Sequence, residues 1–182
     1  MRSIPTALCC IGLVAFASCG PVDAPPEEET PEATSTALIE ALMRVWESGD
    51  VSGLDTLFSP NATYTDMPND RVLSGLGEIE GYVSHVHGWA KDISLDVKVV
   101  KGASDFAYSE WSMCGVQDRP IPGTVRVATN NPFCIDGLTT VSIEDGRIRQ
   151  AVDYIQIVPL MLQLGGRIEL PGGVVLPPPG PG

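Results

Sequence analysis

The chain has 182 residues and a formal net charge of −12, from 11 basic and 23 acidic side chains. This balance argues against a nucleic-acid partner, because phosphate contacts need clustered lysine and arginine. With 43% hydrophobic and 19% charged residues, the composition is that of a globular chain rather than a disordered one. No apolar run approaches the roughly 20 residues of a membrane-spanning helix. The length favours one domain.

The first 18 residues have the layout of a secretory signal. A short basic start precedes the apolar stretch Ile4 to Phe16, and small residues follow it. The run from Phe16 to Cys19 resembles a bacterial lipobox, in which the cysteine becomes the lipidated first residue. We therefore expect a signal peptide over 1–18 and a lipid anchor at Cys19. The domain would then lie in the cell envelope, on its periplasmic or extracellular face, anchored to the membrane without spanning it. The alternative is ordinary secretion, with Cys19 as a free or paired thiol.

Two stretches of unusual composition flank the predicted domain. Residues 19–36 carry five acidic and no basic side chains, which is typical of a solvated, self-repelling tether. Residues 169–182 are rich in proline and glycine and have no capacity to form a core. The folded domain is therefore predicted over 37–168.

Apolar periodicity predicts helices in the first half of the domain. A first helix begins with Thr30 and Pro31 and ends at Gly49-Asp50. The predicted elements that follow are a short helix over 52–58, a strand over 62–66, a loop through 68–70 and a third helix with an apolar stripe from Ile79 to Ala90.

The period then changes to two, which indicates strands. These strands are predicted near 93–99, 104–116, 133–143 and 147–157, with a tight turn at Asp145-Gly146. Helices followed by antiparallel strands indicate an α+β class, with the helices on one face of the sheet.

Cys114 and Cys134 are expected to form a disulfide. They are the two of the five cysteines that lie outside the predicted signal and lipobox. In an oxidising envelope such cysteines are more often paired than reactive. Both are equidistant from residue 124, next to the turn-rich stretch 118–123. In an antiparallel hairpin that turns there, the two side chains would lie opposite each other.

Short motifs occur in a characteristic order over residues 37–165. They are Trp46 to Asp50, Leu57 to Asp66, Gly75 with the helix Glu78 to Val83, Glu110-Trp111, Asp145 to Ile148 and Gln163 to Gly165. In order and spacing they resemble the SnoaL-like polyketide cyclase family, within the nuclear-transport-factor-2-like superfamily. The resemblance implies a cone-shaped fold, with three N-terminal helices packed on a curved antiparallel sheet and an apolar pocket at one end. Relatives include cyclases, a ketosteroid isomerase, epoxide hydrolases, dehydratases and non-catalytic binding modules, so the fold leaves the function open.

Asp66 is the leading candidate for a catalytic base. It resembles the general base of the ketosteroid isomerase in position, and a carboxylate at a dry pocket mouth gains basicity from desolvation. The alternative is that Asp66, which precedes Met67-Pro68, starts a turn through its side chain.

The last strand presents two alternatives for a second acid. Where many SnoaL-like enzymes have an acid, counted back from the glycine of Gln-Leu-Gly, this chain has Gln156. Asp153 lies three positions away and in a regular strand points to the opposite face. If Asp153 faces the pocket, a second catalytic acid exists; if Gln156 does, with Tyr154 beside it, binding is favoured over proton relay.

Four other side chains are candidate substrate contacts. Tyr64, Trp89 and Trp111 are expected in the core or the pocket wall, and His85 near the pocket rim. His85 and His87 lie about 200° apart around a helix, so they cannot ligate one metal together. No cysteine–histidine spacing indicates a metal site, and we expect no metal and no cofactor.

These residues predict a domain that binds a small apolar molecule in its pocket. Its leading activity is proton transfer, isomerisation or cyclisation, with Asp66 as base. The alternative, motivated by Gln156, is a non-catalytic ligand-binding or protein-interaction module. Since relatives often dimerise through the sheet, a homodimer is also expected.

Overall fold

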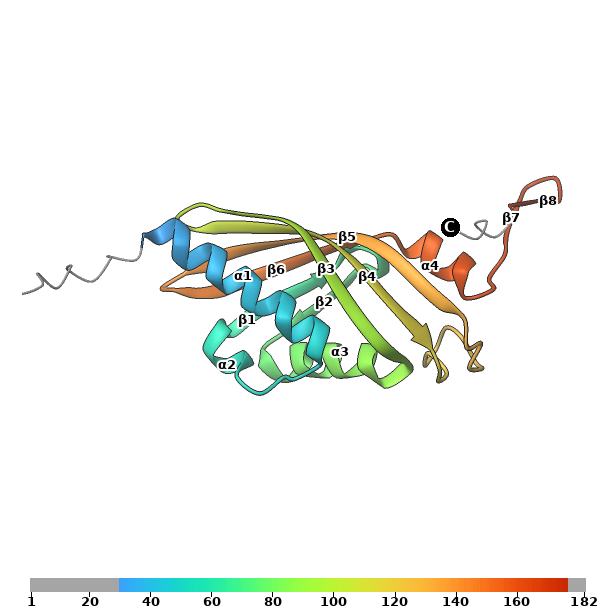
Figure 1. Ribbon diagram of the computed structural model, residues 1–182, viewed down its shortest axis with the longest axis horizontal. Helices are drawn as coiled ribbons and strands as arrows, with labels where there is room; N and C mark the ends of the chain where they lie inside the picture. Colours follow the sequence, from blue (N-terminus) through green and yellow to red (C-terminus); the bar gives the residue numbers. More distant parts are fainter. Residues whose placement is uncertain (1–29, 177–182) are drawn as a thin grey trace, which may run out of the picture.

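A computed structural model describes residues 30–176 (Figure 1). The predicted signal peptide, Cys19 and most of the predicted tether lie outside the described residues. Within them, no helix is both long enough and apolar enough to cross a membrane.

The first helix, α1 (Pro31–Ser48), begins and ends where the sequence predicts. Thr30 caps it by accepting a hydrogen bond from the backbone N–H of Ala33 at 3.2 Å. Gly49 ends it in the left-handed conformation, with φ 70°. The helix therefore starts six residues before the predicted domain boundary at residue 37. Its apolar face, which includes Ile39, Leu42 and Trp46, is buried.

The next elements form one end of the sheet and the layer beneath it. They are α2 (Leu54–Leu57), β1 (Phe58–Asp66), a short 3-10 helix (Met67–Asn69), β2 (Arg71–Ser74) and α3 (Leu76–Trp89). The sequence did not predict β2, which pairs antiparallel with β1. The predicted loop through residues 68–70 is the 3-10 helix and the turn after it.

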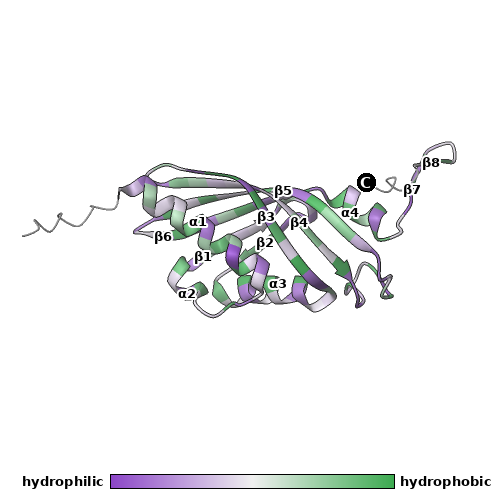
Figure 2. Cartoon of the chain, in the orientation of Figure 1, coloured by the Kyte–Doolittle hydropathy of each residue, from purple (hydrophilic) through white to green (hydrophobic). Residues whose placement is uncertain are grey.

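The remaining strands are long and antiparallel to one another. They are β3 (Ala90–Gly102), β4 (Phe106–Gln117), β5 (Pro132–Glu144) and β6 (Arg147–Ile155). The six-stranded sheet has the order β2-β1-β6-β5-β4-β3, and β1 pairs with β6 in parallel. Asp145 and Gly146 both have positive φ in the predicted tight turn. Hydrophobic residues alternate with polar ones along these strands (Figure 2).

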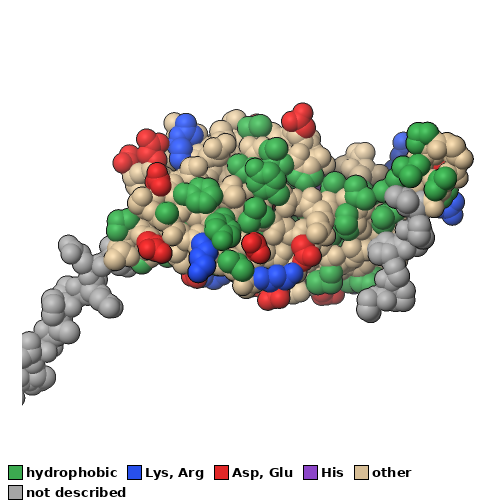
Figure 3. Space-filling model, turned by 90° about the horizontal axis from the view of Figure 1, so that it is seen from above, with side chains coloured by type: hydrophobic (Ala, Val, Ile, Leu, Met, Phe, Trp, Pro, Cys, Tyr) green, Lys and Arg blue, Asp and Glu red, His purple; other side chains and the backbone are tan. Residues whose placement is uncertain are grey.

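The result is the predicted α+β class, with helices packed on one face of a curved sheet. Helices α1 and α3 cover that face, and the core between the layers includes Phe58, Tyr64 and Ile79. Cys114 of β4 lies directly opposite Cys134 of β5, and the two form the predicted disulfide. Figure 3 shows another side of the molecule, where exposed hydrophobic side chains gather in the middle and charged ones lie nearer the edges.

Three elements follow β6 that the sequence did not predict. They are α4 (Ile157–Gln163), β7 (Ile168–Leu170) and β8 (Val174–Leu176). The last two form a separate two-stranded sheet within the stretch predicted to be a tail. Residues up to 157 were predicted as strand, whereas β6 ends at Ile155 and the chain turns into α4.

Candidate functional site

A cavity of about 490 Å³ lies between the helices and the sheet. Its wall is mainly apolar and includes residues from α1, α3, α4 and strands β3 to β6. The volume is within the range of small-molecule sites in proteins. All three tryptophans of the chain, Trp46, Trp89 and Trp111, line it.

Two carboxyl groups lie side by side in this cavity. Asp66 ends β1 and Asp153 lies on β6, and they are register partners across the parallel pair. Each is only 2% exposed, and both line the cavity. Strand alternation places both side chains on the same face, since neighbouring register partners share a face.

Asp153 is held by hydrogen bonds from two directions. Tyr64 donates its hydroxyl hydrogen to Oδ2 at 2.7 Å, and Thr139 donates to Oδ1 at 2.5 Å. Behind these donors, the indole N–H of Trp46 donates to Tyr64 at 2.8 Å and that of Trp111 donates to Thr139 at 2.9 Å. Two indole-to-hydroxyl chains therefore converge on one carboxyl group and fix its position.

Burial raises the pKa of Asp153 from 3.8 to about 7. The hydrogen bonds from Thr139 and Tyr64 oppose this shift because they stabilise the charged form, and the nearby charge of Asp66 adds to it. A carboxyl group with a pKa near 7 exchanges protons readily at neutral pH.

Asp66 has one partnered oxygen and one free oxygen. Its Oδ2 accepts a hydrogen bond from the side-chain amide of Asn69 at 2.7 Å. Its Oδ1 is buried and has no hydrogen-bond partner among the described residues. Leaving a buried carboxylate oxygen unpaired costs free energy, which is recovered if a bound molecule supplies a donor. A 3-10 helix does follow Asp66, but the Asp66 side chain makes no capping hydrogen bond to the backbone of that turn.

Tyr82 and Arg71 lie next to the acidic pair. Burial raises the pKa of the Tyr82 hydroxyl, and the charges of Asp153 and Asp66 raise it further, so the phenol stays protonated at neutral pH. The guanidinium carbon of Arg71 lies 5.9 Å from the centroid of the Tyr82 ring. Both residues line the cavity, and Asn69 and Arg71 are also exposed, which places an opening beside them.

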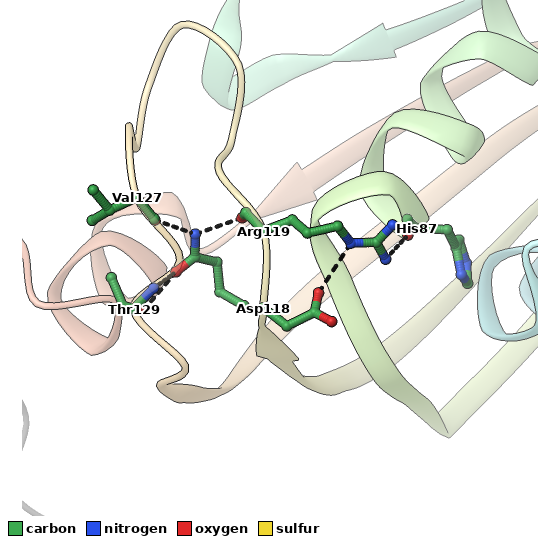
Figure 4. Close-up of polar contacts among 6 residues, drawn as sticks. His87, Asp118, Arg119, Val127 and Thr129 are labelled. Carbon is green, nitrogen blue, oxygen red and sulfur yellow. Dashed lines mark hydrogen bonds and ion pairs between the residues drawn. The ribbon is translucent and has the colours of Figure 1, made fainter.

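One wall of the cavity comes from the loop between β4 and β5, which the buried side chain of Gln117 organises. The Gln117 amide nitrogen donates to the carbonyls of Arg119 at 2.7 Å and Val127 at 2.8 Å (Figure 4). Its amide oxygen accepts from the backbone and hydroxyl of Thr129 at 2.7 and 2.5 Å. The loop is thereby closed on itself, and its residue Ile121 lines the cavity.

The same loop is attached to the end of α3. The backbone N–H groups of Asp118 and Arg119 donate to the carbonyl of Trp89 at 3.2 and 3.3 Å. The Arg119 guanidinium donates to the carbonyl of His87 at 3.2 Å (Figure 4). His87 itself contacts the Trp46 carbonyl through Nε2 at 2.9 Å and does not line the cavity.

Helix α4 closes another side of the cavity. Ile157, Leu160 and Met161 line it. Gln163 fixes the helix to β5, since its side chain accepts from the N–H of Cys134 at 2.7 Å and donates to the Cys134 carbonyl at 2.9 Å. The motif that includes Gln163 was noted in the sequence, but its role in holding a cavity wall was not predicted.

The indole ring of Trp111 lies close to the backbone of Gly137. Gly137 is the register partner of Trp111 on β5. A Cβ atom at position 137 would overlap the indole ring of Trp111. The missing side chain therefore lets the indole lie over the β5 backbone, with its N–H bonded to Thr139.

The structure brings most of the predicted site residues together. Asp66, Asp153, His85, Trp89 and Trp111 line one cavity. Tyr64 does not line it but lies behind Asp153, fully buried, as a hydrogen-bond donor.

Tyr154 and Gln156 do not lie in the cavity, which corrects their prediction as substrate contacts. Tyr154 is 48% exposed, and both residues line a separate depression with Lys98 and Asp136. The physical reason is strand alternation: Asp153 faces inward, so Tyr154 faces outward. The predicted choice between Asp153 and Gln156 is therefore decided for Asp153.

Several site residues were missed in the sequence. Asn69, Arg71, Tyr82 and Thr139 contact the acidic pair or lie beside it, and none was singled out. Tyr82 was visible only as part of the apolar stripe of α3. Within the described residues, no group of three metal-ligating side chains is arranged to hold an ion.

Comparisons with known proteins agree with this architecture. Residues 39–151 match the SnoaL-like domain family. TsrD from Streptomyces laurentii is similar in structure, with a TM-score of 0.64 and 26% sequence identity; the match covers 73% of this chain and 96% of TsrD. Among curated proteins none matches the sequence.

Two further structures show the same fold at lower identity. A protein from Jannaschia sp. CCS1, described as a candidate SnoaL-like polyketide cyclase, has a TM-score of 0.67 and 13% identity, over 79% of this chain and 96% of that one. IdmH from Streptomyces antibioticus, also described only provisionally as a polyketide cyclase, has a TM-score of 0.62 and 19% identity, over 72% of this chain and 98% of IdmH.

Proposed function

Because the chain belongs to the SnoaL-like domain family, we propose that it is an acid–base enzyme that moves a proton on a small apolar carbonyl compound. The observation that carries the proposal is the pair Asp66 and Asp153, buried side by side in a cavity with an apolar wall. Solved relatives described as polyketide cyclases support a carbonyl substrate, since cyclisation of such molecules needs a carbanion or enolate.

Asp66 is the proposed base. Its unpartnered Oδ1 is the oxygen free to take a proton from the carbon next to a carbonyl group. Asn69 holds the other oxygen and so orients the free one. The electron pair of the broken C–H bond moves to the carbonyl oxygen and forms an enolate.

Asp153 is the proposed acid. With a pKa of about 7 it is protonated in a large share of molecules at neutral pH. In that form it donates a hydrogen bond or a proton to the forming enolate oxygen. Where a C=C bond is conjugated with the enolate, return of the proton from Asp66 to the far carbon of that bond re-forms the carbonyl group and gives isomerisation. Where the molecule has a second carbonyl group, attack of the enolate carbon on its carbon gives cyclisation, and the new alkoxide oxygen takes the proton held by Asp66.

The test is exchange of α-hydrogens in a simple apolar ketone. The purified domain is incubated with β-tetralone in deuterium oxide, and NMR follows loss of the α-hydrogen signal. We expect the wild type to exceed buffer, and Asp66→Asn to lower the rate by about a hundredfold to ten-thousandfold. Asp136→Asn is the matched control, because Asp136 lies outside the cavity in an ion pair with Lys98 at 2.7 Å.

Asp153→Asn separates the roles of the two acids. It should lower the exchange rate and remove the pH dependence near neutrality, while Asp66→Asn removes the base itself. Exchange at the buffer rate by the wild type, or equal rates in Asp66→Asn and Asp136→Asn, would support the non-catalytic ligand-binding or protein-interaction alternative.

The same proposal includes a location in the cell envelope. It rests on the lipobox-like run that ends at Cys19 and on the acidic stretch that follows it. A lipid anchor would hold the domain at the membrane surface without a spanning helix.

A further inference from the structure

We infer that the substrate of this cavity carries an anionic group, most simply a carboxylate, which Arg71 binds at the opening. This inference rests on the proposed function and deepens it, because it names the chemical class of the molecule: an apolar body with a carboxylate at one end.

Within the part of the chain that the structure describes, Arg71 is the only lysine or arginine that lines the cavity. Among residues 30–176 its guanidinium forms no ion pair and no side-chain hydrogen bond, and its position on the cavity distinguishes it from the other unpaired basic side chains. A free cation on the rim of an apolar cavity has its donor groups available for a bound molecule.

The guanidinium also lies beside an aromatic ring. Its carbon is 5.9 Å from the centroid of the Tyr82 ring, and Tyr82 is 7% exposed. A cation–π attraction to this buried ring favours the present position of the guanidinium and does not use its N–H groups, which suit two-point hydrogen bonding to a carboxylate. Because Arg71 is the register partner of Asp66, the guanidinium lies at the same end of the cavity as the proposed base.

Charge inside the cavity determines which end of the ligand enters. Asp66 and Asp153 are buried deeper than Arg71 and would repel an anionic group placed against them. The carboxylate of the ligand therefore stays at Arg71, and the uncharged carbonyl and apolar part extend past the acidic pair. The chain carries a net charge of −12, so a local cation favours the binding of an anion at this opening.

A cationic ligand is the main competing possibility. The cavity has two acids and an aromatic wall, which also suit an ammonium group. Arg71 argues against it, because a second cation at the opening would be repelled by the guanidinium. Probes of matched shape and different charge distinguish the two.

The experiment uses phenylbutyrate, its neutral amide phenylbutyramide and the cation phenylbutylamine. Since all three tryptophans line the cavity, binding to the wild type is followed by intrinsic tryptophan fluorescence. We expect phenylbutyrate to bind about tenfold or more tightly than phenylbutyramide, and phenylbutylamine to bind least tightly. Arg71→Gln should abolish the preference, and Arg71→Lys should keep part of it.

Arg44→Gln is the matched control, because Arg44 is an exposed arginine of α1 outside the cavity and its loss changes the net charge equally. Equal binding of acid and amide by the wild type, tightest binding of the amine, no binding of phenylbutyrate, or an unchanged preference in Arg71→Gln would each overturn the inference. Failure of the proposed function is separate: an enzyme-inactive wild type that still prefers the acid through Arg71 leaves the ligand class standing.

Discussion

At Asp153 a single carboxyl group has both a proposed role as an acid and an effect on stability. Burial makes its charged form unfavourable, and two hydroxyl donors offset part of that cost. The folded state therefore holds a proton that the unfolded chain releases above its ordinary pKa of 3.8.

Asp153→Asn is expected to change how stability depends on pH. Because the folded pKa is raised to about 7, the contribution of Asp153 is fully present below about pH 4 and is lost as the pH rises toward 7. Relative to Asp153→Asn, the wild type should lose unfolding free energy across this range, on the order of 1 kcal/mol for each pH unit. Urea denaturation at several pH values measures this difference, and parallel curves for the two proteins would contradict it.

Tyr64→Phe tests the hydrogen-bond chain behind Asp153. The variant removes a donor to the carboxylate and an acceptor for the indole of Trp46. The pKa of Asp153 should rise further, because a bond that favours the charged form is lost, and the unfolding free energy should fall by about 1–3 kcal/mol.

Carbon NMR titration of the Asp153 carboxyl and chemical denaturation measure these two effects. Tyr154→Phe is the control, because that hydroxyl is on the exposed side of the next residue and should leave both quantities unchanged. Equal effects in the two variants would show that Tyr64 does not act on Asp153.

At the scale of elements, capping residues and hydrophobic periodicity predicted the long helix and the long strands. A threonine cap, Pro31 and the final Gly49 mark α1, and a period of two marks β3 to β6. Strand β2 has four residues and α4 has seven, so both are too short for a repeated hydrophobic pattern to identify them. The parallel pairing of β1 with β6 joins segments far apart in the chain, and no local pattern encodes it.

The candidate site was also predictable only in part from the sequence. Alternation along β6 correctly excluded a shared face for Asp153 and Gln156, but it could not determine which of them faces inward. The register of the sheet brings the Thr139 hydroxyl to Asp153, and the packing of α1 brings the Trp46 indole to the Tyr64 hydroxyl that donates to Asp153. Residues that act through tertiary contacts were therefore missed, whereas the two acids themselves were found.

The disulfide between β4 and β5 should stabilise the loop that walls the cavity. Its cysteines are 20 residues apart in sequence, and the enclosed stretch contains Gln117 and Ile121. Replacing both cysteines by serine should lower the unfolding free energy by about 3 kcal/mol, from the loop entropy restored to the unfolded chain.

Denaturation of the double variant and of the wild type, each with and without a reductant, measures this effect. The reductant should destabilise the wild type alone. If the double variant were as stable as the oxidised wild type, the bridge would contribute nothing to the fold.

At the scale of the whole molecule, the described domain and the beginning of the chain have different predicted roles. For the domain we propose binding and conversion of a ligand, while the sequence before it predicts a signal peptide and a lipid anchor. We expect a chain expressed in a bacterium to incorporate labelled palmitate at Cys19 and to partition into detergent. Cys19→Ala should abolish both, and Cys114→Ser is the control that should keep the label. Palmitate incorporation in Cys19→Ala would contradict the anchor.

The contact between Trp111 and Gly137 restricts how the sequence can evolve at these two positions. Any side chain at position 137 would occupy the place of the indole, so the two positions cannot change independently. Descendants of this sequence that keep the tryptophan should keep the glycine, and those that gain a larger residue at 137 should carry a smaller one at 111. Such paired changes would also remove the indole donor to Thr139, so that the history of these two positions records whether the support of Asp153 has been retained.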